Sequence, residues 1–323
     1  GQGYAWEDGP FGGQMSIDSS GVASTPAATY GYVSAALTDG FTVAAGGTNG
    51  DVCNANTKEF VAYQWKANGG TTSTNDDGGT DTELQVNSTA GFSIGNYTGD
   101  GGYSTIGHGL GAIPDLVIIK GRDGTGQGGA AQYWVVGAPN HPEFGNSASK
   151  HVFMDTTSAI MNNTTIWYNT AFSSTTIPIG PHASINGDTA EYIFYAFKNV
   201  QGYSKIGKYI GNGQSDGPVV YTGFKPAFVL IKNLDATQVW IMYDIARKPF
   251  NQDAAVNSLY ASETSAEYTG ASYHNLDILS NGFKIRLTDA SQNGSGVDYL
   301  YMAFAHNPFV TSTDTNSIPT TAQ

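Results

Sequence analysis

The sequence predicts an all-β protein built from tandem β-sandwich domains, jelly-roll-like and of about a hundred residues each, with very little helix. Two observations predict this class. One strand-forming segment, EYIFYAFK at Glu191–Lys198, recurs as DYLYMAFA at Asp298–Ala305 and more loosely as EFVAYQWK at Glu59–Lys66. The polarity comes mainly from Ser, Thr, Asn and 42 glycines, since only 13% of the residues are charged. Short strands joined by tight turns have this composition, whereas helical proteins are richer in charged residues and leucine.

The first ninety residues divide into three expected parts. Residues 1–38 show no sustained periodicity, and we interpret them as an extended arm or a fragment of a preceding domain. Residues 39–67 read as a partial β repeat, in which Gly40–Val43 opens a strand and Phe60–Trp65 closes one. Residues 68–90 are expected to form a linker rich in Gly, Thr and Asp, followed by a leading strand. The chain therefore reads as a processed product or a piece of a longer protein that begins within or after an older unit.

Residues 91–202 and 203–310 are expected to be two full copies of one β-sandwich, followed by a C-terminal tail at 311–323. The copies align with constant spacing, then a slip of loop length, then constant spacing again, as duplication with loop variation produces. The corresponding segments are YTGDG at Tyr97 with YIGNG at Tyr209, GAIPDLVIIK at Gly111 with GFKPAFVLIK at Gly223, WVV at Trp134 with WIM at Trp240, and more loosely NTAF at Asn169 with SNGF at Ser280.

The strands inside each copy have distinct burial patterns. The runs Leu116–Ile119 and Phe228–Ile231 are apolar on both faces, which predicts strands buried between two layers. In the repeated strand Glu191–Lys198, alternation places Tyr192, Phe194 and Ala196 on one face and the side chains between them on the other. Residues 251–267 hold either a turn or two of helix or a long loop.

Charge and cysteine content exclude several classes of protein. The formal net charge is −13, and no basic stripe is present, which disfavours nucleic-acid binding. Cys53 is the single cysteine, so no intramolecular disulfide stabilises the chain, and packing helped by homo-oligomerisation is expected instead. No apolar run approaches the roughly 20 residues that a membrane helix needs, and we expect no membrane insertion.

The repeat motifs resemble a known family. The segments GHGLGAIPDLVIIKGRD, NGDTAEYIFYAFKNVQGYSKIGKYIGNGQSDGPVVYTGFKPAFVLIKN, DILSNGFKIR and DYLYMAFAHNPF are similar to a repeated C-terminal β-domain of unknown function in tail-fibre and other structural proteins of tailed, often marine, bacteriophages. The resemblance runs from about Gly91 to Val310. It implies a virion protein in an extracellular particle, in contact with other virion proteins and with the host surface. It implies no catalytic residues.

Searches for catalytic, metal and cofactor motifs give little. The acidic stretch from Asn75 to Glu83 supplies oxygen ligands of the kind that calcium prefers, but its spacing does not fit an EF-hand, and a solvated linker is the stronger interpretation. The six histidines are scattered without zinc-ligand spacing, and no nucleophile elbow or phosphate-binding loop is present. We therefore expect no catalytic residues and no cofactor, with a structural calcium ion as the alternative.

Aromatic residues in loops are the best candidates for binding chemistry. Sugar rings stack their C–H faces on exposed aromatic rings, while neighbouring amides bind the hydroxyl groups. Trp134 and Trp240 recur in both copies, which favours a core role for them; a site would use aromatics that the copies do not share. The residues that meet this condition, with core packing or a subunit interface as the alternative role for each, are Tyr133, Trp167, Tyr168, Tyr268 and Tyr273.

Two functional hypotheses follow. The first is a non-enzymatic bacteriophage structural protein, a tail-fibre or appendage protein whose loops attach to a host-surface glycan or protein, with a capsid-decorating role as the variant; the fibre analogy favours a trimer. The second is a secreted carbohydrate-binding or glycan-cleaving β-sandwich protein, in which two of the 27 acids would converge in space. A bacterial surface adhesin built from the same repeats is a third, weaker hypothesis.

Overall fold

The computed structural model describes most of residues 32–310, together with Pro319–Thr320. The residues outside this description are 1–31, 38–39, 45–53, 55, 58, 69–70, 123–131, 147–148, 169, 248–250, 252–256, 264, 270–273, 311–318 and 321–323. Most of the expected N-terminal arm, the C-terminal tail apart from Pro319–Thr320, and Tyr273 therefore lie outside the described residues. In the described part, no helix has the length and apolar character needed to cross a membrane.

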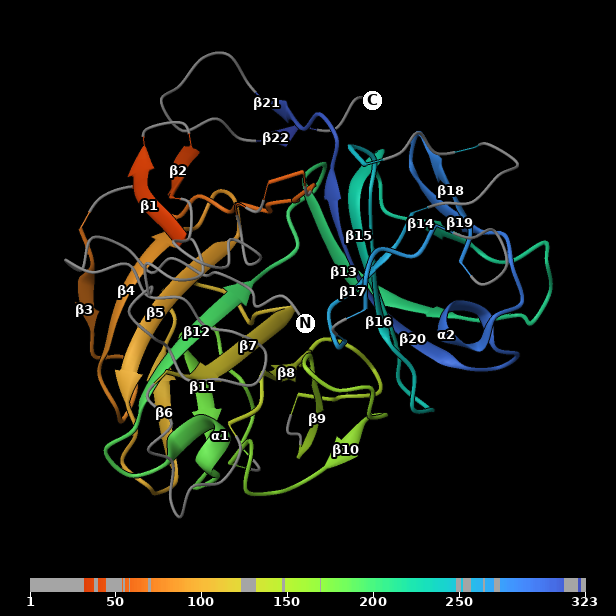
Figure 1. The fold of residues 1–323 in the computed structure, drawn as a ribbon. Coiled ribbons are helices and arrows are strands. Elements are labelled where there is room, and N and C mark those ends of the chain that lie inside the picture. Colours follow the sequence, from red (N-terminus) through yellow and green to blue (C-terminus); the bar gives the residue numbers. More distant parts are fainter. Residues whose placement is uncertain are drawn as a thin grey trace.

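The protein is all-β, and its antiparallel sheets form two sandwich-like domains side by side (Figure 1). The first domain pairs an eight-stranded sheet, in the order β10-β9-β8-β7-β12-β5-β4-β3, with a two-stranded sheet, β11-β6. One short helix, α1, lies against it. The elements are β3 (Ser73–Asn75), β4 (Thr82–Asn87), β5 (Phe92–Thr98), β6 (Ser104–Gly107), β7 (Leu116–Gly121), β8 (Val135–Gly137), β9 (Lys150–Phe153), β10 (Met161–Asn162), β11 (Thr176–Ile179), α1 (Ala183–Asn186) and β12 (Glu191–Phe197).

The second domain pairs a five-stranded sheet, in the order β13-β20-β15-β16-β17, with a three-stranded sheet, β14-β19-β18. Its short helix α2 occupies the place that α1 has in the first domain. The elements are β13 (Ser204–Ile210), β14 (Val219–Tyr221), β15 (Pro226–Asn233), β16 (Trp240–Asp244), β17 (Leu259–Tyr260), β18 (Leu276–Leu279), β19 (Gly282–Ile285), α2 (Ala290–Asn293) and β20 (Asp298–Ala305). Two more hairpins, β1 (Tyr32–Leu37) with β2 (Gly40–Ala44) and β21 (Phe309–Val310) with β22 (Pro319–Thr320), complete the described elements.

The two domains have one strand order, as a duplication would produce. The series β5-β12-β7-β8-β9 in the first domain corresponds to β13-β20-β15-β16-β17 in the second. The smaller sheets correspond through β6 with β11 and β14 with β19. One predicted match was wrong: the strand equivalent to Gly282–Ile285 is Thr176–Ile179 and not Asn169–Phe172, because Ile177 and Phe283 hold the same place opposite the neighbouring strand. The loop that precedes this strand differs in length between the two domains.

A buried tyrosine pair locks each short helix onto its sheet. In the first domain Tyr97 stacks on Tyr192 with ring centroids 5.2 Å apart, and the Tyr192 hydroxyl donates to Ala183 O and accepts from Gly187 N. The second domain repeats each interaction: Tyr209 stacks on Tyr299 at 4.8 Å, and the Tyr299 hydroxyl bonds Ala290 O and Gly294 N. Because a buried hydroxyl needs partners, these bonds fix the helix relative to the strand.

The central strands are buried on both faces, as their composition predicts. Leu116 and Ile118 belong to one apolar cluster, whereas Val117 and Ile119 belong to another. The repeated strand β12 divides in the same way, with Tyr192, Phe194 and Ala196 in one cluster and Ile193, Tyr195 and Phe197 in the other. In the second domain Phe228 and Leu230 face one cluster while Val229 and Ile231 face the other. Each large sheet is therefore the middle layer between two cores.

One of these clusters, the shared core, joins the two domains. It contains the same face of both large sheets, because equivalent residues such as Leu116 and Phe228, or Trp134 and Trp240, all belong to it. The equivalent residues Phe197 and Phe304 contact each other directly, with ring centroids 6.1 Å apart. An interface in which each partner uses the same patch is isologous, as in two-fold dimers. The tandem repeat therefore packs like a dimer whose two subunits are covalently linked.

The N-terminal segments partly depart from expectation. Gly40–Val43 lies in β2, and residues 68–90 supply β3 and β4 to the first domain. Phe60–Trp65, however, forms no strand, so that prediction was wrong. Tyr63 and Trp65 pack onto the shared core instead, and Trp65 contacts both Phe197 and Phe304, at 5.9 and 5.4 Å between centroids. This segment and β12 thus both contribute aromatic side chains to the shared core.

Candidate functional site

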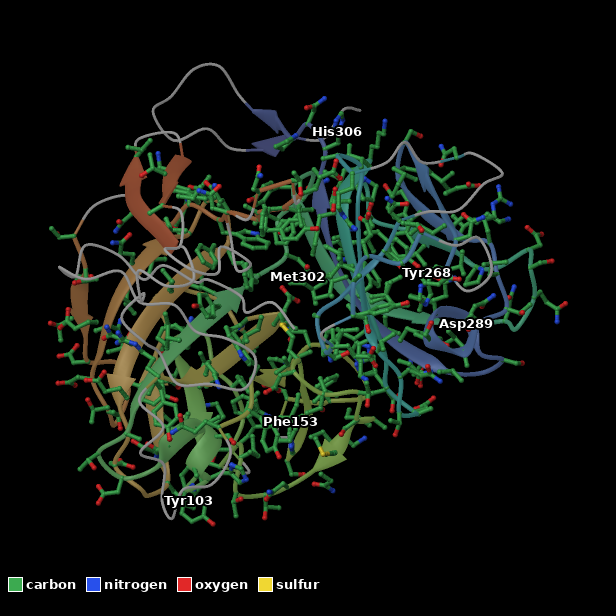
Figure 2. All side chains as sticks on the ribbon, in the orientation of Figure 1. Tyr103, Phe153, Tyr268, Asp289, Met302 and His306 are labelled. Atoms are coloured by element: carbon green, nitrogen blue, oxygen red, sulfur yellow. The ribbon has the colours of Figure 1, made fainter. Side chains whose placement is uncertain are left out.

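An exposed pair of stacked tyrosines lies at the outer end of the first domain. Tyr103, in the turn between β5 and β6, is 55% exposed, and Tyr168, in the loop after β10, is 41% exposed. Their rings stack with centroids 4.7 Å apart and planes 25° apart. Figure 2 shows Tyr103 at the periphery, on the side of its domain away from Met302 in the shared core. Two large apolar faces are thus held together in solvent, where sugar rings can reach them.

The turn that carries Tyr103 is rigidly built. Gly101 takes a positive φ of 70°, and Asp100 accepts a hydrogen bond from Gly102 N at 2.8 Å. Asn186, at the end of α1, donates to Asp100 Oδ1 at 2.7 Å and to Gly102 O at 2.9 Å. Burial alone would raise the pKa of Asp100, but the hydrogen bonds from Gly102 and Asn186 outweigh it and lower that pKa. The turn therefore carries a negative charge and an ordered amide beside the aromatic pair.

The loop that carries Tyr168 is anchored by its neighbour. Trp167 is 0% exposed, contacts Phe172 at 5.2 Å between centroids, and donates from Nε1 to Lys150 O at 3.0 Å. Thr170 Oγ1 donates to Tyr168 O at 3.2 Å. The sequence allows Trp167 either a ligand contact or a packing role, and its complete burial excludes the ligand contact, because a ring enclosed by core side chains offers no face to a ligand. Its structural role is to fix the base of Tyr168.

The other three predicted aromatics are placed differently. Tyr133 is half-buried and stacks on Phe153 with centroids 4.3 Å apart. It packs beside the apolar cluster on the face of the first domain's large sheet that is turned away from the shared core. Tyr268 is also half-buried; its ring contacts His274 at 5.4 Å, and its backbone pairs with Ser258 (Figure 2). Tyr273 lies outside the described residues. The structure thus brings Tyr168 together with Tyr103, and it brings neither Tyr133 nor Tyr268 to that pair.

Tyr103 was missed by the sequence analysis, although the repeat contained a signal. The turn after Tyr97 has a close copy after Tyr209, in which Asn293 donates to Asn212 Oδ1 at 3.2 Å and to Gln214 O at 2.8 Å. In that copy the position of Tyr103 is occupied by Ser215. An aromatic residue that is present in only one of two equivalent turns meets the criterion that a site uses residues the copies do not share.

A small polar cavity opens on the first domain near the same strand end. Its volume is about 190 Å³, and Arg122 lies 3.7 Å from Glu191 at its wall. Ligand pockets usually have volumes of about 300–1,000 Å³, so this cavity accommodates a single small group rather than a whole ligand. Its lining residues are Asp81, Thr82, Glu83, Asn96, Tyr97, Thr98, Arg122 and Glu191.

The acidic stretch from Asn75 to Glu83, the alternative site for a calcium ion, takes part in local hydrogen bonds. Asn75 Nδ2 donates to Asp77 Oδ2 at 2.9 Å, and Thr74 donates to Glu83. Within the described part of the chain, no group of three or more His, Cys, Asp or Glu side chains has a geometry that holds a metal ion. Four histidines are buried at structural positions; burial lowers the pKa of His151 and of His274 to about 4.

Comparison with known proteins identifies a family but no function. The family model described as "Domain of unknown function (DUF7483)" matches residues 12–308. Neither the curated proteins nor the solved structures include a significant match to the chain. The match covers both sandwich domains and most of the segment before them.

Proposed function

Because the chain belongs to this DUF7483 family of unknown function, its role is argued from its own residues, and we propose that it is a non-enzymatic structural protein of a bacteriophage virion. In this proposal it is a tail-fibre or appendage protein that binds a glycan of the host surface. The observation that carries the binding role is the exposed Tyr103–Tyr168 pair at the outer end of the first domain.

The chemistry of the pair suits carbohydrate. A pyranose ring has one face of C–H groups that packs on an aromatic ring and an edge of hydroxyl groups that need hydrogen-bond partners. Beside Tyr103, the carboxylate of Asp100 is an acceptor held in place by Asn186. A tyrosine pair exposed to solvent has an unfavourable apolar surface that a sugar ring covers at little conformational cost, since both loops are already fixed.

The virion context rests on the repeat motifs and the composition. The motifs resemble those of bacteriophage structural proteins, and the low charge, with abundant Ser, Thr, Asn and Gly, suits a durable extracellular surface. A single shallow aromatic site binds weakly. Several copies in a homo-oligomer multiply weak contacts into useful avidity.

The binding proposal is tested with the intact chain on an array of bacterial surface glycans. We expect binding to one glycan class, with a loss of about tenfold, or about 1.4 kcal/mol, for Tyr103→Ala and for Tyr168→Ala. Ile210→Ala is the control, because Ile210 is an exposed apolar residue at the end of β13 in the second domain, at 53% exposure. Undiminished binding by the double variant Tyr103→Ala/Tyr168→Ala would contradict the proposed site.

The position of the protein in the virion and its proposed non-enzymatic character are tested separately. Immunogold labelling of the intact particle is expected to mark the tail appendage, and labelling of the capsid shell would replace this role with a capsid-decorating one. Chromatography of the glycan after incubation is expected to show unchanged chain length. Release of shorter sugars would overturn the non-enzymatic proposal in favour of a glycan-cleaving enzyme.

A further inference from the structure

The outer edge of β6 in the first domain is covered by the chain that precedes it. Thr80 forms a parallel bridge with Ile106, and Thr80 N donates to Thr105 O at 3.0 Å. Thr82 Oγ1 donates to Gly107 O at 3.0 Å. The backbone groups of β6 that face away from β11 thus have partners, and we call residues 78–82 the covering segment.

The covering segment fits closely because the residues at the contact are small. A Cβ atom on Gly78 would lie 2.4 Å from Thr105 O, and one on Gly107 would lie 1.5 Å from Asn75 Oδ1. Both distances are shorter than any real Cβ contact. A side chain at Gly78 would displace the covering segment, because its Cβ would meet the backbone of β6, whereas one at Gly107 would push aside the Asn75 side chain. The small residues at this contact therefore allow the covering segment to lie close against the edge of β6.

The equivalent edge in the second domain is β14. Pro218 O accepts from Ile285 N, and Thr222 N donates to Asn281 O, so every second residue from 218 to 222 faces β19. Antiparallel pairing alternates, and the amide and carbonyl groups of Val219 and Tyr221 consequently face the outer edge. Within the described residues no strand pairs there, since β14 is the edge of its sheet. Among the residues that the structure describes before this domain, none forms a second covering segment along β14.

The side chains at this edge are apolar. Val219 is 59% exposed and Tyr221 is 69% exposed, and Tyr221 holds the place that Gly107 holds in the first domain. Proteins usually protect an open edge strand with charged residues or proline at its centre, because such an edge pairs with other chains. Two large apolar side chains flanking a free ladder are the opposite of protection and indicate a surface that is normally covered.

We propose that β14 pairs with β14 of a second copy of this chain, which extends the three-stranded sheet across a two-fold axis. The edge is self-complementary. Antiparallel pairing centred on Val220 places Val219 opposite the partner subunit's Tyr221, and the converse contact repeats it. Cross-strand pairs of a β-branched and an aromatic residue are among the favourable ones. Addition of a strand to an open edge is a common mode of association, in which the main chain supplies the hydrogen bonds.

Charged residues border this apolar edge on its own sheet. Lys284, opposite Val219 on β19, forms an ion pair with Asp216, and Arg286 pairs with Asp277. These charges are paired within one chain, and the apolar edge is the part of this sheet to which no described strand is added. A second copy fits this arrangement, because it brings an edge of identical chemistry and no unbalanced charge.

The test is sedimentation velocity of the full chain over a range of concentrations. We expect the wild type to form dimers. Tyr221→Lys is expected to weaken dimerisation at least tenfold by placing a like charge on both edges. Val219→Pro is expected to do the same, because it removes an amide that faces the edge while the bonds to β19 stay intact. The control Tyr103→Lys changes an equally exposed tyrosine of the first domain, and it is expected to leave the dimer unchanged.

The outcomes that overturn the proposal are distinct from those that concern glycan binding. A wild type that stays monomeric, or forms a trimer, contradicts the two-fold contact. Dimers that persist in both edge variants place the contact elsewhere. Circular dichroism of each variant is measured alongside, and we expect unchanged spectra because both side chains are largely exposed. None of these results depends on whether Tyr103 and Tyr168 bind a sugar.

Discussion

The two domains are nearly identical inside and different at their ends and edges. Both stack a lysine over a tryptophan, Lys120 over Trp134 and Lys232 over Trp240, each with 6.0 Å from Nζ to the ring centroid. Both lock a short helix with a stacked tyrosine pair. Only the first domain has an aromatic residue, Tyr103, in the turn that follows the first tyrosine of this pair.

The difference between the domains separates structural from functional positions. Packing positions that recur in both copies maintain the fold, because each copy needs the same core and the same helix lock. Positions that differ are free of that requirement. The tyrosine pair and the open edge of β14 both fall among the differences, which is why we propose that binding takes place there.

The largest expected effect is the loss of the shared core. Phe197→Ala and Phe304→Ala each remove an aromatic ring from the interface, and each should lower the free energy of unfolding by about 3–5 kcal/mol. The two losses should be similar because the rings are equivalent and contact each other. Urea denaturation measures both. A loss below about 1 kcal/mol for either variant would break the equivalence.

Acid is expected to destabilise both domains through their buried histidines, and His151 in the first domain and His274 in the second have strongly lowered pKa values. Burial lowers the pKa of His151 and of His274 to about 4, whereas the unfolded chain binds these protons below about 6.5. The free energy of unfolding therefore falls as the pH falls from about 6.5 to 4. Asp155 acts in the opposite direction, because burial raises its pKa to about 6 and the folded state then binds the extra proton.

Two histidines outweigh one carboxyl group, and we expect a net loss on the order of 2 kcal/mol at pH 4. Denaturation at a series of pH values measures the slope. His274→Gln should flatten the slope whatever its effect on stability at pH 7. An unchanged slope would show that this histidine does not control the response to acid.

The tyrosine locks should respond equally. Tyr192→Phe and Tyr299→Phe each remove a hydroxyl that bonds two backbone groups of its helix, at a cost of about 1–3 kcal/mol. Tyr103→Phe is the control, because its side chain is exposed. Thermal melts compare the three. Unequal losses from the two locks would mean that the duplication has diverged inside as well as outside.

Much of this architecture could be predicted from the sequence. Composition and the repeated strand predict an all-β tandem protein, and alternation correctly assigns the two faces of β12, because side-chain direction in a strand follows from residue parity alone. Phe60–Trp65 was assigned to a strand wrongly, since strand composition does not reveal whether a partner strand is available. Trp167 looked like a loop aromatic because burial depends on contacts distant in sequence. The stacking of Tyr103 on Tyr168 depends on two loops that meet only in the folded chain.

The smallest expected effect concerns the helix caps, where the domains differ. Asp289 caps α2 through a hydrogen bond from Ser291 N at 2.8 Å, and Asp289→Ala should cost about 1 kcal/mol. His182 caps α1 through a longer bond, 3.1 Å from Ser184 N, and His182→Ala should cost less. Thermal melts at pH 7 rank the two. A larger loss of stability from His182→Ala than from Asp289→Ala would contradict the prediction that Asp289 is the stronger cap.

Differential scanning calorimetry of the intact chain tests most directly whether the two domains share one core. Separate domains usually unfold in separate transitions. Here the same face of each large sheet is buried in the shared core. Unfolding one domain would therefore expose to water the face of the other domain's large sheet that lies in this core. We predict a single transition whose calorimetric and van't Hoff enthalpies agree for both domains together. Two resolved transitions, one for each domain, would contradict the account.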